Sequence, residues 1–218
     1  MRMRRLKWAH DFLEQQPHLI KEPETMKGKW KQLLNKETLH VEIGCGKGDY
    51  WVQMGKRYSE SGWIGIEKNE SAAALAMRNY VNQGEESHMR FIYGDAATIT
   101  EWFAPKEVDV IHLNFSDPWP KTRNHKRRLS HAGFLTKYKQ ILNSEGQIIM
   151  KTDNSDLFEF SLLQFQNEGF CLADVSVDFR RAIHEEDVIT EYERRFMEKG
   201  QPIYRAVFVL QDDLPSNI

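Results

Sequence analysis

The stretch Val41-Glu-Ile-Gly-Cys-Gly-Lys-Gly48 closes a short apolar run, Leu39 to Ile43, with alternating glycines. Glycine has no Cβ, so the chain can turn tightly there and approach a bound molecule closely. A second apolar run ends in Gly65-Ile66-Glu67, at about the spacing where an acidic side chain meets a ribose hydroxyl in nucleotide-binding α/β folds. These two strand ends predict an α/β fold with a nucleoside-type ligand.

Short apolar runs alternate with longer amphipathic stretches from residue 39 onward, a pattern typical of alternating strands and helices. We expect parallel strands at 39–43, 63–66, 89–93, 108–113 and 147–151, and helices at 47–58, 71–83, 130–142 and 155–168. Ser130 is the expected cap of the third helix, and Asn154 or Ser155 that of the fourth. The runs 169–179 and 203–210 have no long crossover between them, which predicts a late antiparallel pair.

The chain has 218 residues, which suits one main domain with a substantial core. We expect a basic N-terminal extension over residues 1–37 and the main domain over residues 38–218. The formal net charge is −2, so local patches must hold any polyanion. Two candidate patches, either of which could also be ordinary solvated charge, are Arg2, Arg4, Arg5 and Lys7, and the basic run from Lys121 to Arg128.

Cysteine usage and hydropathy exclude several classes of protein. Cys45 and Cys171 lie far apart and lack C-x-x-C spacing, so we expect neither a disulfide framework nor a metal site. The sequence shows no apolar core of a secretory signal and no run of about 18 to 20 apolar residues. We therefore expect a cytoplasmic protein with no membrane association.

The stretch Asn114-Phe-Ser-Asp-Pro-Trp-Pro-Lys121 closes the apolar run 108–113 with a carboxylate, an indole and two prolines. Each proline disfavours helical geometry in the preceding residue, so we expect Asp117 and Trp119 to be extended. Open α/β sheets place ligands at such strand ends. Asp117 could also cap a turn, and Trp119 could stack on a displaced base or simply pack internally.

The glycine turn is compatible with several ligands. A phosphate-binding P-loop would need serine or threonine after Lys47, where Gly48 stands, and a dinucleotide fingerprint would need glycine in place of Asp49. Glu42 would repel a pyrophosphate, so the pattern favours a phosphate-free adenosyl ligand such as S-adenosylmethionine. Gly94-Asp95-Ala96 closes the third strand and is a further place for adenine contacts. A tight turn that binds no ligand is the alternative.

Taken together, the motifs resemble those of the bacterial tRNA (guanine-N7)-methyltransferase family, and the resemblance covers nearly the whole chain. They are Glu42-Ile-Gly-Cys-Gly-Lys-Gly48, Gly65-Ile-Glu67, Asn114 to Lys121, Lys126-Arg-Arg-Leu129, Lys151-Thr-Asp-Asn154 and Thr190-x-Tyr192-Glu193. The glycine motif is shared by many methyltransferases, whereas Asn-Phe-Ser-Asp-Pro-Trp-Pro is highly specific. The resemblance implies a Rossmann-like class I methyltransferase fold, with a seven-stranded, mostly parallel sheet, a C-terminal antiparallel strand, and helices on both faces.

The resemblance also implies three sets of contacts and a tRNA partner, the target being the guanine of the variable loop. The cofactor S-adenosylmethionine would be contacted at Glu42, Gly44, Gly46, Glu67, Asp95 and Asp117. The target nucleotide would be contacted at Lys121, Asp153, Thr190, Glu191, Tyr192 and Glu193. RNA would be contacted at Arg123, Asn124, His125, Lys126, Arg127 and Arg128. The protein would act as a monomer or homodimer, without a metal.

The chemistry of guanine N7 agrees with these residue types. The N7 lone pair lies in the ring plane, so methylation needs no general base, but the ring becomes cationic. Carboxylates beside the base would stabilise that charge, which makes Asp117 the candidate catalytic residue, with Asp153 beside it. A carboxylate would also accept hydrogen bonds from guanine N1 and N2, which adenine cannot offer at N1. Helix capping is the alternative role for Asp153 and for the pair Thr190 and Glu191.

Two other functions compete. Methyltransferases that act on the exocyclic amine of adenine carry Asn/Asp-Pro-Pro-aromatic loops at the same strand end, but here Trp119 follows Pro118. The chain could instead be a tRNA-binding module that kept the cofactor fold without catalysis. Intact carboxylates at successive strand ends speak against that module.

Overall fold

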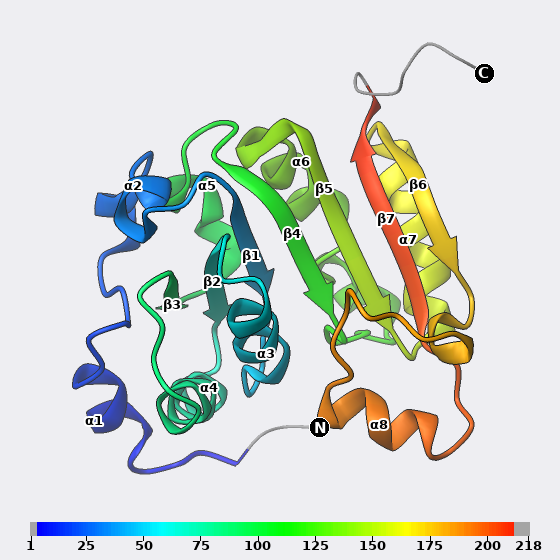
Figure 1. Ribbon diagram of the computed structural model, residues 1–218. Helices are drawn as coiled ribbons and strands as arrows, with labels where there is room; N and C mark the ends of the chain where they lie inside the picture. Colours follow the sequence, from blue (N-terminus) through cyan, green and yellow to red (C-terminus); the bar gives the residue numbers. More distant parts are fainter. Residues whose placement is uncertain (1–3, 212–218) are drawn as a thin grey trace.

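In the computed structural model, which describes residues 4–211, seven strands form one sheet in the order β3-β2-β1-β4-β5-β7-β6 (Figure 1). The strands are β1 Leu39–Ile43, β2 Gly62–Glu67, β3 Met89–Tyr93, β4 Val108–Asn114, β5 Leu142–Thr152, β6 Phe170–Ser176 and β7 Tyr204–Leu210. Strand β7 is antiparallel to both β5 and β6, and the other neighbours pair in parallel. The predicted fold class, including the late antiparallel pair, is confirmed.

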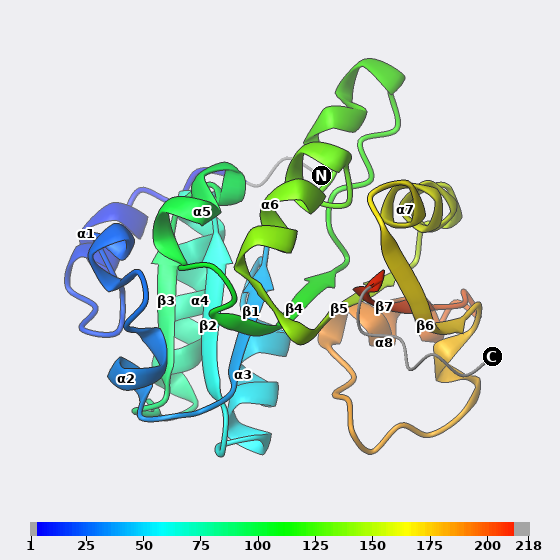
Figure 2. The same ribbon diagram turned by 90° about the horizontal axis from the view of Figure 1, so that it is seen from above.

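Helices cover both faces of this sheet. They are α1 Ala9–Glu14, α2 Trp30–Leu34, α3 Asp49–Arg57, α4 Glu70–Asn82, α5 Ile99–Trp102, α6 Ala132–Ile141, α7 Ser155–Asn167 and α8 Glu191–Met197. Short 3-10 turns are η1 Pro23–Met26, η2 Ala96–Thr98, η3 Thr122–Arg127 and η4 Phe179–Arg181. Helices α3 and α4 lie on one face, and α5, α6 and α7 lie on the other (Figure 2). None of the helices in residues 4–211 is long and apolar enough to cross a membrane.

The helix caps agree with the sequence at α7 and differ at α6. Asn154 caps α7, because its side chain accepts a hydrogen bond from the Leu157 N–H at 2.8 Å. Ser130 was expected to cap α6, but the cap is His131, which accepts from the Gly133 N–H at 3.1 Å. Ser130 is buried instead and accepts a hydrogen bond from the Ser161 hydroxyl at 2.7 Å, which joins α6 to α7.

The described part of the N-terminal extension contributes to the core of the main domain. Trp30 in α2 is fully buried, and its indole N–H donates to the carbonyl of Trp102 at 2.8 Å. The Glu107 carboxylate accepts the backbone N–H groups of Gly28 and Trp30 at 2.9 and 3.1 Å. These contacts fasten the extension to the segment that precedes β4.

The strand order determines where a ligand can bind. Chain order runs outward in one direction from β1 through β2 to β3, and in the other from β4 to β5, so the order reverses between β1 and β4. Open α/β sheets bind ligands beyond the carboxyl ends of the strands at such a reversal. The glycine turn after β1 and the loop after β4 therefore flank the expected crevice.

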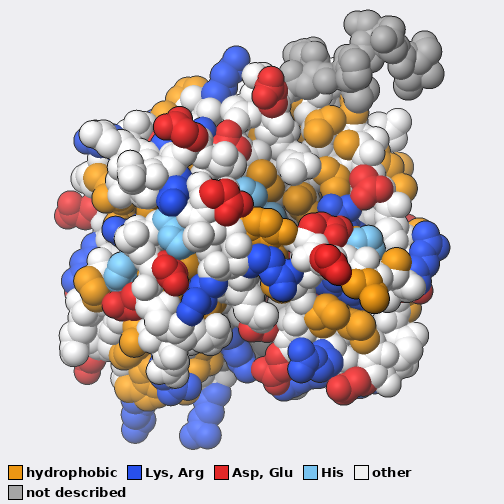
Figure 3. Space-filling model, in the orientation of Figure 1, with side chains coloured by type: hydrophobic (Ala, Val, Ile, Leu, Met, Phe, Trp, Pro, Cys, Tyr) orange, Lys and Arg blue, Asp and Glu red, His pale blue; other side chains and the backbone are white. Residues whose placement is uncertain are grey.

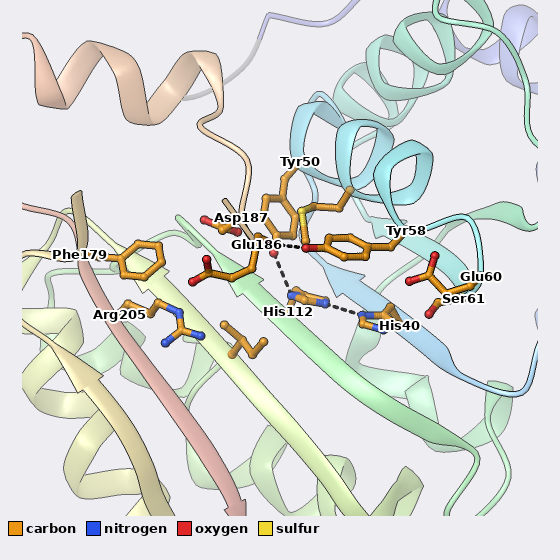
Figure 4. A pocket seen from close by; sticks show the side chains of 12 residues that line it. His40, Tyr50, Tyr58, Glu60, Ser61, His112, Phe179, Glu186, Asp187 and Arg205 are labelled. Atoms are coloured by element: carbon orange, nitrogen blue, oxygen red, sulfur yellow. Dashed lines mark hydrogen bonds between the residues drawn. The ribbon is translucent and has the colours of Figure 1, made fainter. Parts of the chain in front are cut away.

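A pair of histidines lies in the middle of the sheet, away from those strand ends. His40 Nδ1 and His112 Nε2 are 3.0 Å apart, and the Tyr50 hydroxyl is 3.3 Å from His112 Nδ1. These residues line a cavity of about 170 Å³ between α3 and the segment before α8 (Figure 4). Burial lowers the pKa of His40 to about 4 and the pKa of His112 well below its ordinary value.

This pair predicts a loss of stability in mild acid. Between about pH 6.5 and about pH 4 the unfolded chain protonates both imidazoles and the folded chain does not, so the free energy of unfolding falls as pH falls. We expect a His112→Asn variant to show a shallower decline, measured by urea unfolding at several pH values across that window. The exposed His10 provides a matched control as His10→Asn, and an undiminished slope in His112→Asn would contradict the assignment.

Candidate active site at the carboxyl ends of the strands

The glycine turn after β1 combines a packed side with an open side. Gly44, Gly46 and Gly48 have φ values of +74°, +57° and +74°, and the Gly44 N–H donates to the Ile66 carbonyl at 2.8 Å. A Cβ on Gly48 would lie 2.8 Å from the Cβ of Ala76, so the approach of α3 to α4 requires glycine there. A Cβ on Gly46 would meet nothing within 4 Å among the described residues. The turn therefore faces open space at Gly46.

Glu67, at the end of β2, is held by the same turn. Its carboxylate accepts the Gly46 N–H at 3.0 Å through Oε2 and the Asn69 N–H at 2.8 Å through Oε1. Each oxygen retains a further acceptor site, so the carboxylate can still bind the hydroxyls of a sugar. Burial raises the pKa of Glu67. Asp95, beyond β3 at the same edge, is exposed and accepts the Ala97 N–H at 3.0 Å.

Glu42 carries an unsatisfied carboxylate oxygen at the strand-order reversal. Its side chain is 2% exposed, and Oε1 accepts a hydrogen bond from Asn114 Nδ2 at 3.0 Å. Glu42 Oε2 and Asn114 Oδ1 are buried with no hydrogen-bond partner in the described part of the chain. Burial raises the pKa of Glu42 to about 7, against the opposing effects of Asn114 and the Lys151 charge. Unpaired buried acceptors are costly, so this pair suits a ligand that donates hydrogen bonds.

The loop after β4 is held in an uncommon backbone conformation. Phe115 and Trp119 have φ values of +50° and +40°, a region that bulky side chains rarely adopt. The expected extended geometry of Trp119 is therefore wrong. The Phe115 N–H donates to the Lys151 carbonyl at 2.8 Å, and Arg128 Nε donates to the Pro118 carbonyl at 2.8 Å. Such strain persists only where surrounding contacts enforce it, and it concentrates at functional sites.

The basic segment after this loop divides into exposed and buried cations. Lys121, Arg123, Lys126 and Arg127 are exposed, and Asn124 and His125 are partly exposed. Figure 2 shows the segment before α6 extending away from the sheet. The Arg127 guanidinium lies 4.9 Å from the Trp119 ring centroid, so it covers one face of that indole.

Arg128 differs from its neighbours, because its side chain is only 3% exposed. Its guanidinium lies 4.4 Å from the ring centroid of Phe160 and bonds the Pro118 carbonyl. In this structure the Arg128 side chain supports the loop. The RNA contact expected at Arg128 stays a prediction.

The residues Thr190 to Glu193 form the start of α8. The Thr190 hydroxyl accepts the Glu193 N–H, and Glu193 Oε2 accepts the Thr190 N–H, both at 3.1 Å. Thr190 therefore caps α8, as the capping alternative predicted, but its partner in the capping box is Glu193 and not Glu191. Glu193 is fully buried and serves the capping box of α8, and the nucleotide contact expected at Glu193 stays a prediction. The Glu191 N–H donates to Asp49 at 2.7 Å, which ties α8 to α3.

Tyr192 and two carboxylates gather from three different elements. The Tyr192 ring is 46% exposed, and its centroid lies 4.9 Å from that of Phe115. Burial raises the pKa of Tyr192, and the nearby carboxylates of Asp153 and Asp117 raise it further. Asp153 is partly buried, which raises its own pKa, and it is not the cap of α7 because Asn154 is. The capping role considered for Asp153 is therefore wrong.

The motif analysis missed a buried ion cluster beneath α8. It consists of Lys151, Arg180, Asp187 and Glu193. The available signal was a lysine at the end of an apolar strand, where a buried charge needs a partner. The partners come from a segment with no regular hydrophobic pattern, so their positions could not be derived from spacing.

Charge on the face that carries α3 and α8 is mixed. Figure 3 shows basic, acidic and apolar side chains interspersed there, with no large field of one sign. Of the N-terminal basic cluster, Arg4, Arg5 and Lys7 are exposed, and Arg2 lies outside the described residues. That local basic segments hold a polyanion stays a prediction.

Solved structures with the same fold are methyltransferases of low sequence identity. The 16S rRNA methyltransferase KamB aligns with a TM-score of 0.62 at 10% identity, covering 84% of this chain and 93% of that one. An antibiotic-related methyltransferase aligns with a TM-score of 0.61 at 17% identity, covering 83% and 92%. At these identities the likeness supports the fold alone.

Sequence comparison is more specific. The Methyltransf_4 family model, which describes a methyltransferase family, matches residues 36–206. The tRNA (guanine-N(7)-)-methyltransferase of Bacillus licheniformis is 44% identical over 208 residues, covering 94% of this chain and 97% of the relative. Those of Oceanobacillus iheyensis and Bacillus subtilis are each 42% identical with the same coverage. The chain therefore belongs to the tRNA (guanine-N(7)-)-methyltransferase family.

Proposed function

We propose that the carboxyl edge of the sheet is where this tRNA (guanine-N7)-methyltransferase binds S-adenosylmethionine and the variable-loop guanine of tRNA. The observation that carries the proposal is that the Tyr192 ring packs against Phe115 of the loop after β4, close enough to Asp117 and Asp153 for their charges to raise its pKa. Family membership favours transfer to guanine N7 over the adenine-amine and non-catalytic alternatives. Because the substrate is tRNA, we also propose that the enzyme acts in the cytoplasm.

The donor set fits the cofactor. The unpaired oxygens of Glu42 and Asn114 would accept hydrogen bonds from the ammonium group of its methionine part. Glu67 would bind the ribose hydroxyls, with Asp95 at the adenine side, and the open side of Gly46 would allow close approach. The bound cofactor supplies an electrophilic methyl group on a sulfonium.

The residues of the chain then act on the purine. N7 attacks with its own lone pair, so no side chain has to remove a proton, and positive charge develops on the ring. Carboxylates fixed beside the base stabilise that charge more in the transition state than in the ground state. Asp117 lies in a loop with two strained residues, and both Asp117 and Asp153 are close enough to Tyr192 to raise its pKa. Tyr192 offers a partly exposed ring on which a displaced base can stack.

The first prediction tests the reaction itself. Incubation with unmodified tRNA and labelled cofactor, followed by borohydride and aniline, should cut the RNA in the variable loop, because that chemistry cleaves at 7-methylguanosine. Asp117→Ala should lower the turnover number by on the order of 100-fold or more, since it removes a charge beside the cationic ring. Asp11→Ala, in α1, is the matched control. Label without scission would support the adenine alternative, and near-normal turnover in Asp117→Ala would remove that residue from the mechanism.

A second prediction concerns pH. The pKa of Glu42 is about 7 in the free protein, and only its ionised form attracts a cationic ammonium. Cofactor affinity should therefore rise as the pH increases from about 5.5 to about 7.5, with proton release on binding. Glu42→Gln should bind more weakly and with a flat pH profile, measured by calorimetry in two buffers of different ionisation enthalpy. An unchanged profile in Glu42→Gln would contradict this role.

A third prediction concerns the exposed cations that follow the β4 loop in tRNA binding. Lys126→Ala combined with Arg127→Ala should weaken binding and reduce the slope of log affinity against log salt by roughly 1.4 to 1.8, because two phosphate contacts are lost. Lys29→Ala with Lys106→Ala removes two exposed lysines, one just before α2 and one just before β4, and should leave the slope unchanged. Equal effects from both pairs would indicate general charge attraction only.

A further inference from the structure

A lysine with almost no solvent exposure lies at the carboxyl end of β5. Lys151 is 1% exposed, and its ammonium lies 2.7 Å from Asp187 Oδ2 and 3.3 Å from both oxygens of Glu193. Arg180 bonds the same two carboxylates at 2.5 and 2.7 Å. The cluster balances two cations with two carboxylates, and each side chain is at most 10% exposed.

This cluster is the attachment point of α8 to the sheet. Asp187 belongs to the segment that leads into α8, and Glu193 forms the capping box of α8 with Thr190. Both carboxylates bind Lys151, so the ammonium connects α8 and the segment that precedes it to β5. A second contact joins α8 to α3, because Asp49 accepts a hydrogen bond from the Glu191 N–H.

The backbone of the same lysine holds the loop after β4. The Lys151 carbonyl accepts the Phe115 N–H at 2.8 Å, and Phe115 packs against Tyr192. Asp153 follows two residues later on the same chain. Lys151 is therefore linked to all three segments: its carbonyl binds the loop of Asp117, its ammonium binds the carboxylates that hold the helix of Tyr192, and Asp153 follows it in the chain.

Stability alone does not require a lysine in this position. Burying an ammonium is expensive, and an apolar side chain of similar length often fills such a site at no loss of stability when its partners are also neutral. An ammonium, however, fixes the direction of several hydrogen bonds at once. The Lys151 ammonium also lies over the Tyr50 ring, 4.5 Å from its centroid.

We propose that Lys151 is a positioning residue for methyl transfer: through Asp187 and Glu193 it holds α8, and thereby Tyr192, against the Asp117 loop. The inference rests on the proposed function of this site. Lys151 touches neither substrate nor cofactor in this role. It sets the distance between groups that do.

The variant Lys151→Met tests this role. Misplacement of reacting groups by about 1 Å can lower a rate by about 100-fold, so we expect a loss of that order in kcat for tRNA. Cofactor affinity should change by less than about twofold when measured near pH 8.5, where Glu42 is ionised despite the loss of the Lys151 charge. Amide hydrogen exchange should accelerate in residues 190–197 and stay unchanged in β1 to β4. Lys31→Met, which removes a lysine of α2 that pairs with Asp109 at 2.7 Å near the amino end of β4, should retain normal turnover.

A second variant keeps the buried charges balanced. It shows whether Lys151 acts by positioning α8 or only by neutralising the buried carboxylates, and it avoids the unpaired buried charge that could unfold the single variant. Lys151→Met with Asp187→Asn leaves Arg180 paired with Glu193, so the buried charges still cancel. We expect this double variant to fold and to keep the low kcat, because Glu193 has still lost its anchor on β5. Full recovery of kcat in the double variant would overturn the proposal.

Other outcomes are also decisive. A kcat within about twofold of the wild type, or unchanged exchange in α8, would overturn the positioning role. Recovery of kcat in Lys151→Met at high pH would show that the lysine acts through the ionisation of Glu42 instead. If the wild-type protein produced no 7-methylguanosine, the proposed function would fail, whereas the exchange result would still report on the anchor.

Discussion

The parallel pairing of β1 with β4 is the constraint on which the site depends. It places the ends of two strands side by side where the order of the sheet reverses, so the glycine turn and the Asp117 loop must face each other. The Glu42–Asn114 hydrogen bond spans this junction and leaves one acceptor unpaired on each side chain. The sheet thereby buries two hydrogen-bond acceptors without partners, and a bound ligand can supply the donors.

Buried cations organise the carboxyl edge of the sheet, where the proposed active site lies. Arg128 fixes the Pro118 carbonyl, and Lys151 fixes α8 by its side chain and the Asp117 loop by its backbone. In water such contacts would be weak, but exclusion of solvent strengthens them and makes their loss expensive. Loops without regular hydrogen bonding can then hold a single conformation, including the positive φ angles of Phe115 and Trp119.

This arrangement separates two tasks of the basic residues. Lys126 and Arg127 are exposed, and in the proposed function such cations would attract phosphates without regard to sequence. Buried cations, such as Arg128, hold the backbone of the neighbouring loop in place. Arg127 combines both features. It is solvent-exposed, and its guanidinium lies over Trp119 in the loop that carries Asp117.

The sequence by itself determined the strand and helix alternation, the glycine turn, the acidic strand ends and the family, because each depends on local periodicity or on motifs of fixed spacing. Only the tertiary structure decided that Arg128 and Glu193 are buried, that His131 caps α6, that Trp119 has positive φ, and that Lys151 anchors α8. Those facts depend on which distant segments meet and exclude water. Residues far apart in sequence, such as Lys151 and Asp187, acquire their roles only through that packing.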